Sequence, residues 1–141
     1  MINGIVLQKM QTLDEVLTEL RSLLPLRLEQ LEKDWRTRRA VERNLQVAVE
    51  IVIDVCQRLI HVTGQSPATT GRDAVERCIQ GGILSDYDPF RKMVQFRYFI
   101  VHRYERIDPV ILADIVNSRL SDFERFRDEV LAYVRRELDE K

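Results

Sequence analysis

The sequence predicts an all-α protein, a bundle of four main helices with one or two short ones. Apolar residues recur at intervals of three and four along most of the chain, which is the spacing of one face of a helix. Five glycines and four prolines in 141 residues leave room for long helices joined by short loops. No segment has the alternation of apolar and polar residues that is typical of a strand.

The length of the chain favours one compact domain, which we expect to span residues 1–141. The formal net charge is −1, so a strongly basic protein that binds nucleic acid by bulk charge is excluded, and any contact with a polyanion must be local. Two cysteines, Cys56 and Cys78, are too few for a disulfide framework. We interpret them as reduced packing residues of a cytoplasmic protein.

The N-terminal residues contain no cationic segment followed by an apolar one, so no signal peptide is expected. The most apolar run, residues 47–55, is interrupted by Glu50 and Asp54. A membrane-spanning helix is therefore not expected either.

The first predicted helix carries a narrow apolar seam with strictly alternating steps of four and three residues. Its members are Val6, Met10, Leu13, Leu17, Leu20 and Leu24. Such a seam packs against a nearly parallel neighbour, either within the domain or on a second copy of the chain. Pro25 is expected to end this helix.

Residues 28–63 contain neither proline nor glycine and predict one long helix that ends at Gly64. Asp54 lies beside an apolar face of this helix, where a partly buried carboxylate favours a cationic partner. Arg97 is the candidate that the rest of the chain offers.

The first part of this long helix carries a local basic cluster beside Trp35, formed by Arg36, Arg38, Arg39 and Arg43. Two interpretations stay open. The cluster is either a solvated helix face with partners such as Glu42, or a set of phosphate contacts for RNA.

Three further helices are predicted from their capping residues. Thr70 caps a short helix that stops at Gly81-Gly82, and Asp108-Pro109 starts another short helix. A capping-box pattern at residues 121–124 predicts the start of the last amphipathic helix.

The remaining helix begins near Asp88-Pro89 and contains the most informative stretch, residues 96–105. Arg97 occupies a position on its apolar stripe where a leucine is expected, and a guanidinium there needs a carboxylate, an open cleft or a phosphate. His102 follows five residues later, about 140° around the helix. Asp108-Pro109 requires the helix to end soon afterwards, so His102 and Tyr104 lie near a helix end.

The spacing Arg97-x4-His102-x-Tyr104 resembles the signature of the HepT-like branch of the HEPN superfamily. Residues 43–50 with Ile53-Asp54 are similar to the family's long second helix, and residues 81–84 are similar to the turn before its motif helix. The resemblance covers residues 38–125. It implies a homodimeric HEPN-like bundle of four to five helices.

The resemblance also implies an activity, that of a ribonuclease toxin in a toxin–antitoxin pair. Arg97 and His102 are then the catalytic residues, with Asp54 and Tyr98 in support, and RNA is cut at a composite site on a two-fold axis. No metal ion or cofactor is expected, and tRNA is a candidate substrate. These residue types suit the chemistry, because histidine transfers protons near neutral pH and arginine binds phosphoryl oxygens.

The family further implies a partner, a MntA-like minimal nucleotidyltransferase that acts as antitoxin by transferring AMP to the motif tyrosine, here Tyr104. In one respect the chain departs from the family. Many members have a small polar residue directly after the arginine, where this chain has Tyr98.

Other readings of the same residues stay open. The chain is alternatively a non-catalytic helical subunit that binds a minimal nucleotidyltransferase, or a plain scaffold in which Arg97 pairs with Asp54 and His102 caps a helix. His61 is expected to be structural or exposed. A di-metal carboxylate bundle is excluded because the sequence contains no Glu-x-x-His pair.

Overall fold

The structure is a computed structural model that describes residues 2–102 and 107–139, with side chains for residues 4–99 and 107–137. The described part is helical and contains no strand, which confirms the all-α prediction. Its helices are α1 (Ile2–Arg21), α2 (Leu28–Lys33), α3 (Trp35–Val62), α4 (Gly71–Gln80), α5 (Asp88–His102), α6 (Pro109–Ser118) and α7 (Leu120–Tyr133), followed by the π-helical segment η1 (Val134–Asp139).

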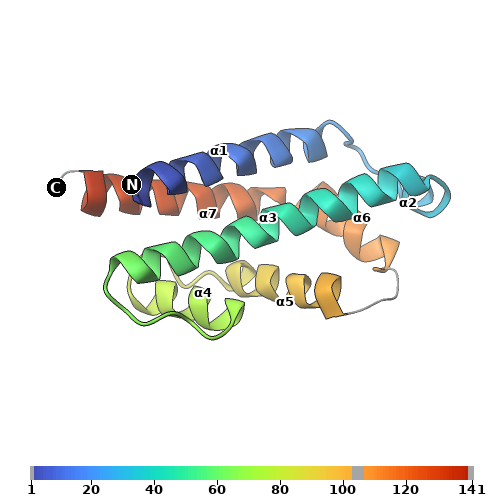
Figure 1. Ribbon diagram of the computed structural model, residues 1–141. Coiled ribbons are helices and arrows are strands. Elements are labelled where there is room, and N and C mark those ends of the chain that lie inside the picture. Colours follow the sequence, from blue (N-terminus) through green and yellow to red (C-terminus); the bar gives the residue numbers. More distant parts are fainter. Residues whose placement is uncertain (1, 103–106, 140–141) are drawn as a thin grey trace.

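Helix α3 is the centre of the bundle and contacts α1, α2, α4, α5 and α6. Figure 1 shows α1 and α7 along one side of α3, and α4 and α5 along the other. The two helices that follow the main loop therefore form a layer of their own against α3.

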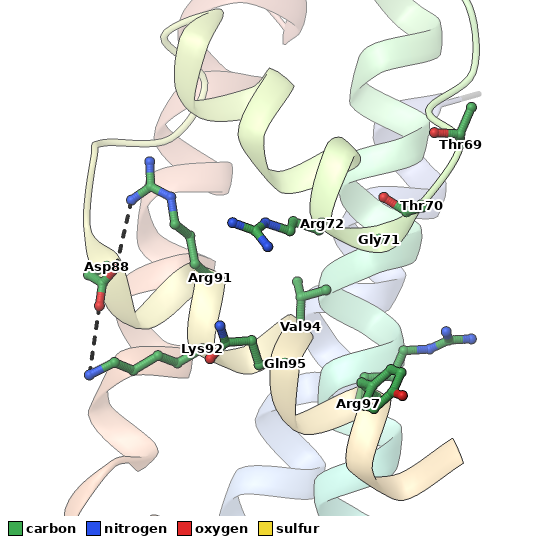
Figure 2. A pocket seen from close by; sticks show the side chains of 11 residues that line it. Thr69, Thr70, Gly71, Arg72, Asp88, Arg91, Lys92, Val94, Gln95 and Arg97 are labelled. Carbon is green, nitrogen blue, oxygen red and sulfur yellow. Dashed lines mark ion pairs between the residues drawn. The ribbon is translucent and has the colours of Figure 1, made fainter. Parts of the chain in front are cut away.

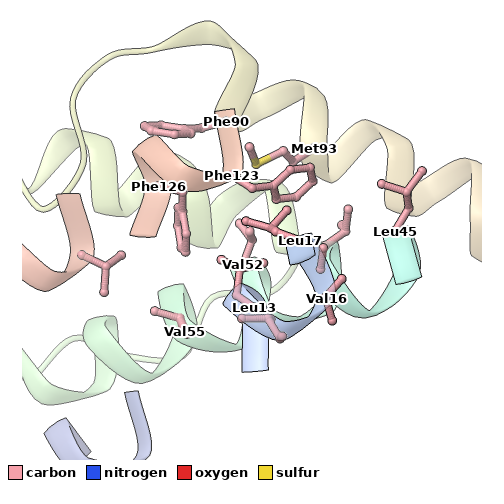
Figure 3. Close-up of a cluster of buried hydrophobic side chains, with 14 of the residues drawn as sticks. Leu13, Val16, Leu17, Leu45, Val52, Val55, Phe90, Met93, Phe123 and Phe126 are labelled. Carbon is pink, nitrogen blue, oxygen red and sulfur yellow. The ribbon is translucent and has the colours of Figure 1, made fainter. Parts of the chain in front are cut away.

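The core lies between α3, α1, α7 and α5, and Figure 3 shows part of it. From the predicted seam of α1, Val6, Met10, Leu13, Leu17 and Leu20 are buried. Leu24 is not, because α1 ends at Arg21 and leaves this side chain 36% exposed. Phe90 of α5 packs edge-on against Phe126 of α7, with their ring centroids 5.9 Å apart. This contact fixes the first turn of α5 to the core.

The prediction of one helix over residues 28–63 is wrong, because Asp34 divides it into α2 and α3. Asp34 has extended backbone angles (φ −107°, ψ 97°). Its carboxylate accepts hydrogen bonds from the backbone N–H groups of Arg36 and Thr37 and from the Thr37 hydroxyl, at 3.1, 3.4 and 2.8 Å. A side chain that satisfies these free N–H groups favours a new helix start over continuation.

The other helix ends follow their capping residues, with one exception. Thr70 caps α4, Asp108 caps α6, and Gly64 adopts the positive φ (82°) that suits a helix stop. The predicted capping box at residues 121–124 is wrong, because α7 already begins at Leu120. Asp122 is buried instead and accepts a hydrogen bond from the Tyr87 hydroxyl at 2.7 Å.

Candidate functional site

Arg97 lies on the side of α5 that faces α3. Its Nε donates a hydrogen bond to Oε1 of Glu50 at 3.1 Å, and 37% of its side chain is exposed. No other hydrogen bond or ion pair of Arg97 occurs among the described side chains. The terminal nitrogens of the guanidinium therefore remain available to an oxyanion, which they would bind as a planar fork.

The predicted pairing of Arg97 with Asp54 is wrong. Asp54 lies one turn further along α3, where it accepts a hydrogen bond from Nε of Arg58 at 3.1 Å and forms an ion pair with Lys9 of α1 at 3.3 Å. Asp54 therefore joins α1 to α3 and is not part of the Arg97 site.

Glu50 is the site residue that the sequence alone did not identify. It lies four residues before Asp54, so both carboxylates project from neighbouring turns of α3. The sequence signal for Glu50 was its position as an acidic residue within the apolar run of residues 47–55. The choice between the two carboxylates depends on where α5 crosses α3, which helical periodicity does not specify.

A groove runs between the start of α4 and α5, with Arg97 and Tyr98 among its lining residues (Figure 2). Its volume is about 640 Å³, within the range typical of small-molecule sites. The lining comes from one stretch of chain and comprises Thr69, Thr70, Gly71, Arg72, Asp88, Arg91, Lys92, Val94, Gln95, Arg97 and Tyr98.

The groove is locally basic, with four cationic side chains and one carboxylate in its lining. Arg91 is held by Glu76 of α4 and by Asp86, to which its terminal nitrogen donates at 2.7 Å. The hydrogen bond from Arg91 lowers the pKa of the Glu76 carboxyl, and both carboxylates raise the pKa of Arg91. This network ties α4 to the start of α5.

Tyr98 follows Arg97 directly and is 58% exposed. Its ring meets that of Phe99 edge-on, with centroids 6.1 Å apart and planes at 81°. The groove thus has an aromatic side chain next to its arginine.

The other two motif residues are only partly described. His102 is the last residue of α5, and its side chain lies outside the described residues. Tyr104 lies entirely outside them. Their roles, and the expected place of the histidine near a helix end, therefore stay predictions.

The basic cluster of α3 divides into buried and exposed members. Arg38 is only 4% exposed, and its Nε lies 3.4 Å from Glu42 without hydrogen-bond geometry. The prediction of Arg38 as an RNA-phosphate contact is therefore corrected. Arg36, Arg39 and Arg43 are exposed, and Arg43 lines a second hollow, formed by α1 and α3, with Asp54.

Across residues 4–99 and 107–137, no three His, Cys, Asp or Glu side chains are grouped so that they could hold a metal ion. None of the helices in the described part of the chain combines the length and apolar character that crossing a membrane requires. Cys56 and Cys78 are free thiols, both buried, and the Cys78 thiol lies 3.7 Å from the Cys56 carbonyl oxygen.

Known proteins resemble this chain in sequence and in fold. The mRNA nuclease HepT of Shewanella oneidensis is 25% identical over 133 residues, which cover 93% of this chain and 99% of that protein. A solved structure of a tri-AMPylated Shewanella oneidensis HEPN toxin in complex with MNT antitoxin superposes with a TM-score of 0.81 at 25% identity, covering 91% of this chain and 97% of the toxin chain.

A second solved structure, a toxin–antitoxin with AMP-PNP, gives a TM-score of 0.82 at 24% identity over 92% of this chain and 98% of the matched chain. At this identity the likeness concerns the fold, and it confirms the HEPN-like bundle expected from the sequence. The family described as ribonuclease HepT-like matches residues 13–130. This match spans most of the helical bundle, and the chain belongs to the ribonuclease HepT-like family.

Proposed function

We propose that this protein is an endoribonuclease toxin of a toxin–antitoxin pair and that Arg97 and His102 carry out the cleavage. The observation that carries the proposal is the position of Arg97. It is half-exposed beside a basic groove, oriented by Glu50 through Nε alone, and the same helix contains the motif histidine. Family membership supports the same activity.

The proposed reaction is attack of a ribose 2′-oxygen on the adjacent phosphorus. A neutral imidazole accepts the 2′-hydroxyl proton, the bond from phosphorus to the 5′-oxygen breaks, and an imidazolium returns a proton to that oxygen. Arg97 stabilises the negative charge that develops on the phosphoryl oxygens. The products are a 2′,3′-cyclic phosphate and a 5′-hydroxyl, and no step requires a metal ion.

We propose that the active form is a homodimer. One histidine cannot easily serve both sides of an in-line displacement, whereas a two-fold axis supplies two histidines and two arginines to one cleft. The apolar side chains that remain exposed at the end of α5 and the start of α6, namely Phe99, Val110 and Ile111, support an interface there.

We further propose regulation by a MntA-like nucleotidyltransferase that transfers AMP to Tyr104. The HEPN toxin similar to this chain is AMPylated and bound to an MNT antitoxin. An added phosphate close to a phosphate-binding site would compete with RNA by charge and by volume. The proposal places this protein in the cytoplasm, where its RNA substrate is found.

The test is cleavage of RNA by the partner-free protein in EDTA, with mRNA and tRNA as separate substrates. The similar HepT protein is an mRNA nuclease, and tRNA is the substrate that the family resemblance suggested. We expect 2′,3′-cyclic phosphate ends, and His102→Ala should slow cleavage by at least about 100-fold, the contribution of general acid–base catalysis.

His61→Ala is the matched control, because His61 is the other histidine of the chain and is exposed at the end of α3. It should cut like the wild type. Equal cleavage by the two histidine variants would show that His102 does not carry out the cleavage. Intact RNA with the wild-type protein would favour the non-catalytic partner subunit instead. That reading also predicts that induced expression leaves cell growth unaffected.

A further inference from the structure

The groove between α4 and α5 contains one arginine, Arg72, that no described side chain holds by a hydrogen bond or an ion pair, although its charge helps to lower the pKa of Glu76. Arg91 is bound by Glu76 and Asp86, and Arg97 is bound by Glu50. For Arg72, no ion pair or hydrogen bond is found among the described side chains, and it is exposed. Figure 2 shows its side chain extending from the start of α4 into the space between α4 and α5.

Lys92 is the second cation of the groove that is only weakly held. Its Nζ lies 3.7 Å from Asp88, and both side chains are about two-thirds exposed, at 64% and 66%. Exposed pairs of this kind contribute little to stability. Arg72 and Lys92 are therefore two exposed cations in the lining of the groove, whose charges an external anion can recruit.

The groove also offers a surface for a nucleobase. Tyr98 lines it and is more than half exposed. Proteins that bind single-stranded nucleic acid combine cations along the backbone with aromatic side chains on which bases stack. Along α5, Lys92 and Tyr98 lie six residues apart, which is about 9 Å of helix, so cation and ring fit one short segment of strand.

We infer that the α4–α5 groove is a single-strand RNA subsite beside the scissile position, in which Arg72 and Lys92 bind flanking phosphates and Tyr98 stacks on a base. This inference rests on the proposed ribonuclease function and names the substrate form, an unpaired strand. It also gives Tyr98 a role in substrate binding, at the position where the chain departs from its family.

The experiment measures binding of the full-length protein to a fluorescein-labelled 2′-O-methyl RNA strand of mixed sequence, by fluorescence anisotropy at several salt concentrations. The 2′-O-methyl group removes the nucleophile, so binding is observed without cleavage. For Arg72→Gln we expect weaker binding and a salt dependence of log K that is less steep by about 0.7, the loss of one phosphate contact on a single strand. Arg72→Lys should keep the steeper dependence.

The matched control is Arg135→Gln, which removes the same charge. Arg135 is an exposed arginine of η1 and is distant in sequence from the groove. For Tyr98→Leu we expect affinity to fall by about 5- to 150-fold, the range reported for loss of one base stack, with an unchanged salt dependence. Tyr98→Phe should bind like the wild type.

Equal salt dependence for Arg72→Gln and Arg135→Gln, or equal affinity for Tyr98→Leu and Tyr98→Phe, would overturn the inference. A duplex of the same sequence that binds as tightly as the single strand would also overturn it. Cleavage by the wild type in EDTA is measured separately. If the wild type cleaves RNA and Arg72→Gln binds RNA as tightly as the wild type, only the proposed subsite is contradicted. If binding depends on Arg72 and the wild type does not cleave RNA, only the proposed ribonuclease function is contradicted.

Discussion

Within the described part of the chain, the Arg97 guanidinium is held by a carboxylate at Nε only. Glu50 holds Nε, the Arg97 side chain is 37% exposed, and its terminal nitrogens have no partner among the described side chains. An arginine buried in a full salt-bridge network would be costly to redirect toward a substrate. A single carboxylate contact positions the group and leaves its charge available.

Glu50→Gln tests this positioning role. The pair is exposed, so the free energy of unfolding should fall by less than about 1 kcal/mol. RNA cleavage should fall by up to about 100-fold, the cost of misplacing a reacting group by about an ångström. Urea denaturation and initial cleavage rates measure the two effects.

The comparison variant is Asp54→Asn, which breaks the contacts to Lys9 and Arg58 and does not involve Arg97. It should affect stability to a similar extent and leave cleavage unchanged. If Asp54→Asn reduced cleavage more than Glu50→Gln, the role assigned to Glu50 would be wrong.

The contact between Glu76 and Arg91 predicts a pH dependence of stability. The hydrogen bond from Arg91 lowers the pKa of Glu76 below its ordinary value of 4.5. A carboxyl whose pKa is lowered in the folded state stabilises the fold above its unfolded pKa, and this contribution is lost as pH falls through the folded-state value.

Glu76→Gln should therefore lower the melting temperature at neutral pH, and the difference from the wild type should shrink as the pH falls below 4.5. Thermal denaturation followed by circular dichroism over this pH range is the measurement. Glu15→Gln, a change at an exposed position of α1, should show no such difference. A Glu76→Gln deficit that persisted undiminished in acid would show that the effect is not due to the charge of Glu76.

At the scale of the element, the site depends on how closely α4 approaches α3 and α5. Gly71, the first residue of α4, makes this approach possible. A Cβ added there would lie 2.9 Å from Cδ1 of Ile53 in α3 and 3.3 Å from Cγ1 of Val94 in α5. The groove keeps its width because this position has no side chain.

Gly71→Val should lower the free energy of unfolding by about 1–3 kcal/mol, the usual cost of overpacking, and should weaken binding of single-stranded RNA by displacing α4. Gly4→Val is the control, because a Cβ at Gly4 meets no atom within 4 Å. Chemical denaturation and fluorescence anisotropy give the two quantities. A Gly71→Val protein with wild-type stability and affinity would show that α4 adjusts without cost.

Most elements were predictable because their ends are encoded locally. Thr70 and Asp108 each cap the helix that follows, and Gly64 supplies the positive φ of a stop. The break at Asp34 was missed because a lone aspartate within a long polar helix face gives no signal of its own. The capping box at Ser121 was predicted wrongly because α7 begins at Leu120 and Asp122 is buried against Tyr87. A local sequence pattern cannot predict this tertiary contact.

At the scale of the whole molecule, the proposed active site requires two copies of the chain. Mixing wild-type chains with His102→Ala chains tests this requirement. A mixed dimer keeps only one of the two histidines that the proposed cleft uses, so its cleft lacks either the base or the acid. An equal co-refolded mixture should then keep about a quarter of the wild-type rate, since only about a quarter of its dimers contain two wild-type chains.

His102→Ala alone should remain inactive, and light scattering should report a dimer in every sample. A mixture of the wild type with His61→Ala is the control and should keep the full rate. A His102→Ala mixture that keeps about half of the wild-type rate, with mixed dimers present, would show that each chain cleaves RNA independently.

The overall bundle and the place of Arg97 in it were predictable from periodicity and from the family resemblance. The α4–α5 groove was not, because it depends on how two helices joined by a loop pack against each other. Arg38 is a second case in which the sequence did not predict the environment of a residue. Its sequence context suggested a solvated cation, yet the contact of α3 with its neighbours buries it.

The groove is lined entirely by residues 69–98, while α1, α3 and α7 lie outside that stretch. A single recombination event that exchanges this segment between relatives would replace the whole of the proposed RNA subsite and leave most of the core sequence intact. Diversification of target preference in such toxins therefore requires neither a new fold nor coordinated changes at distant positions.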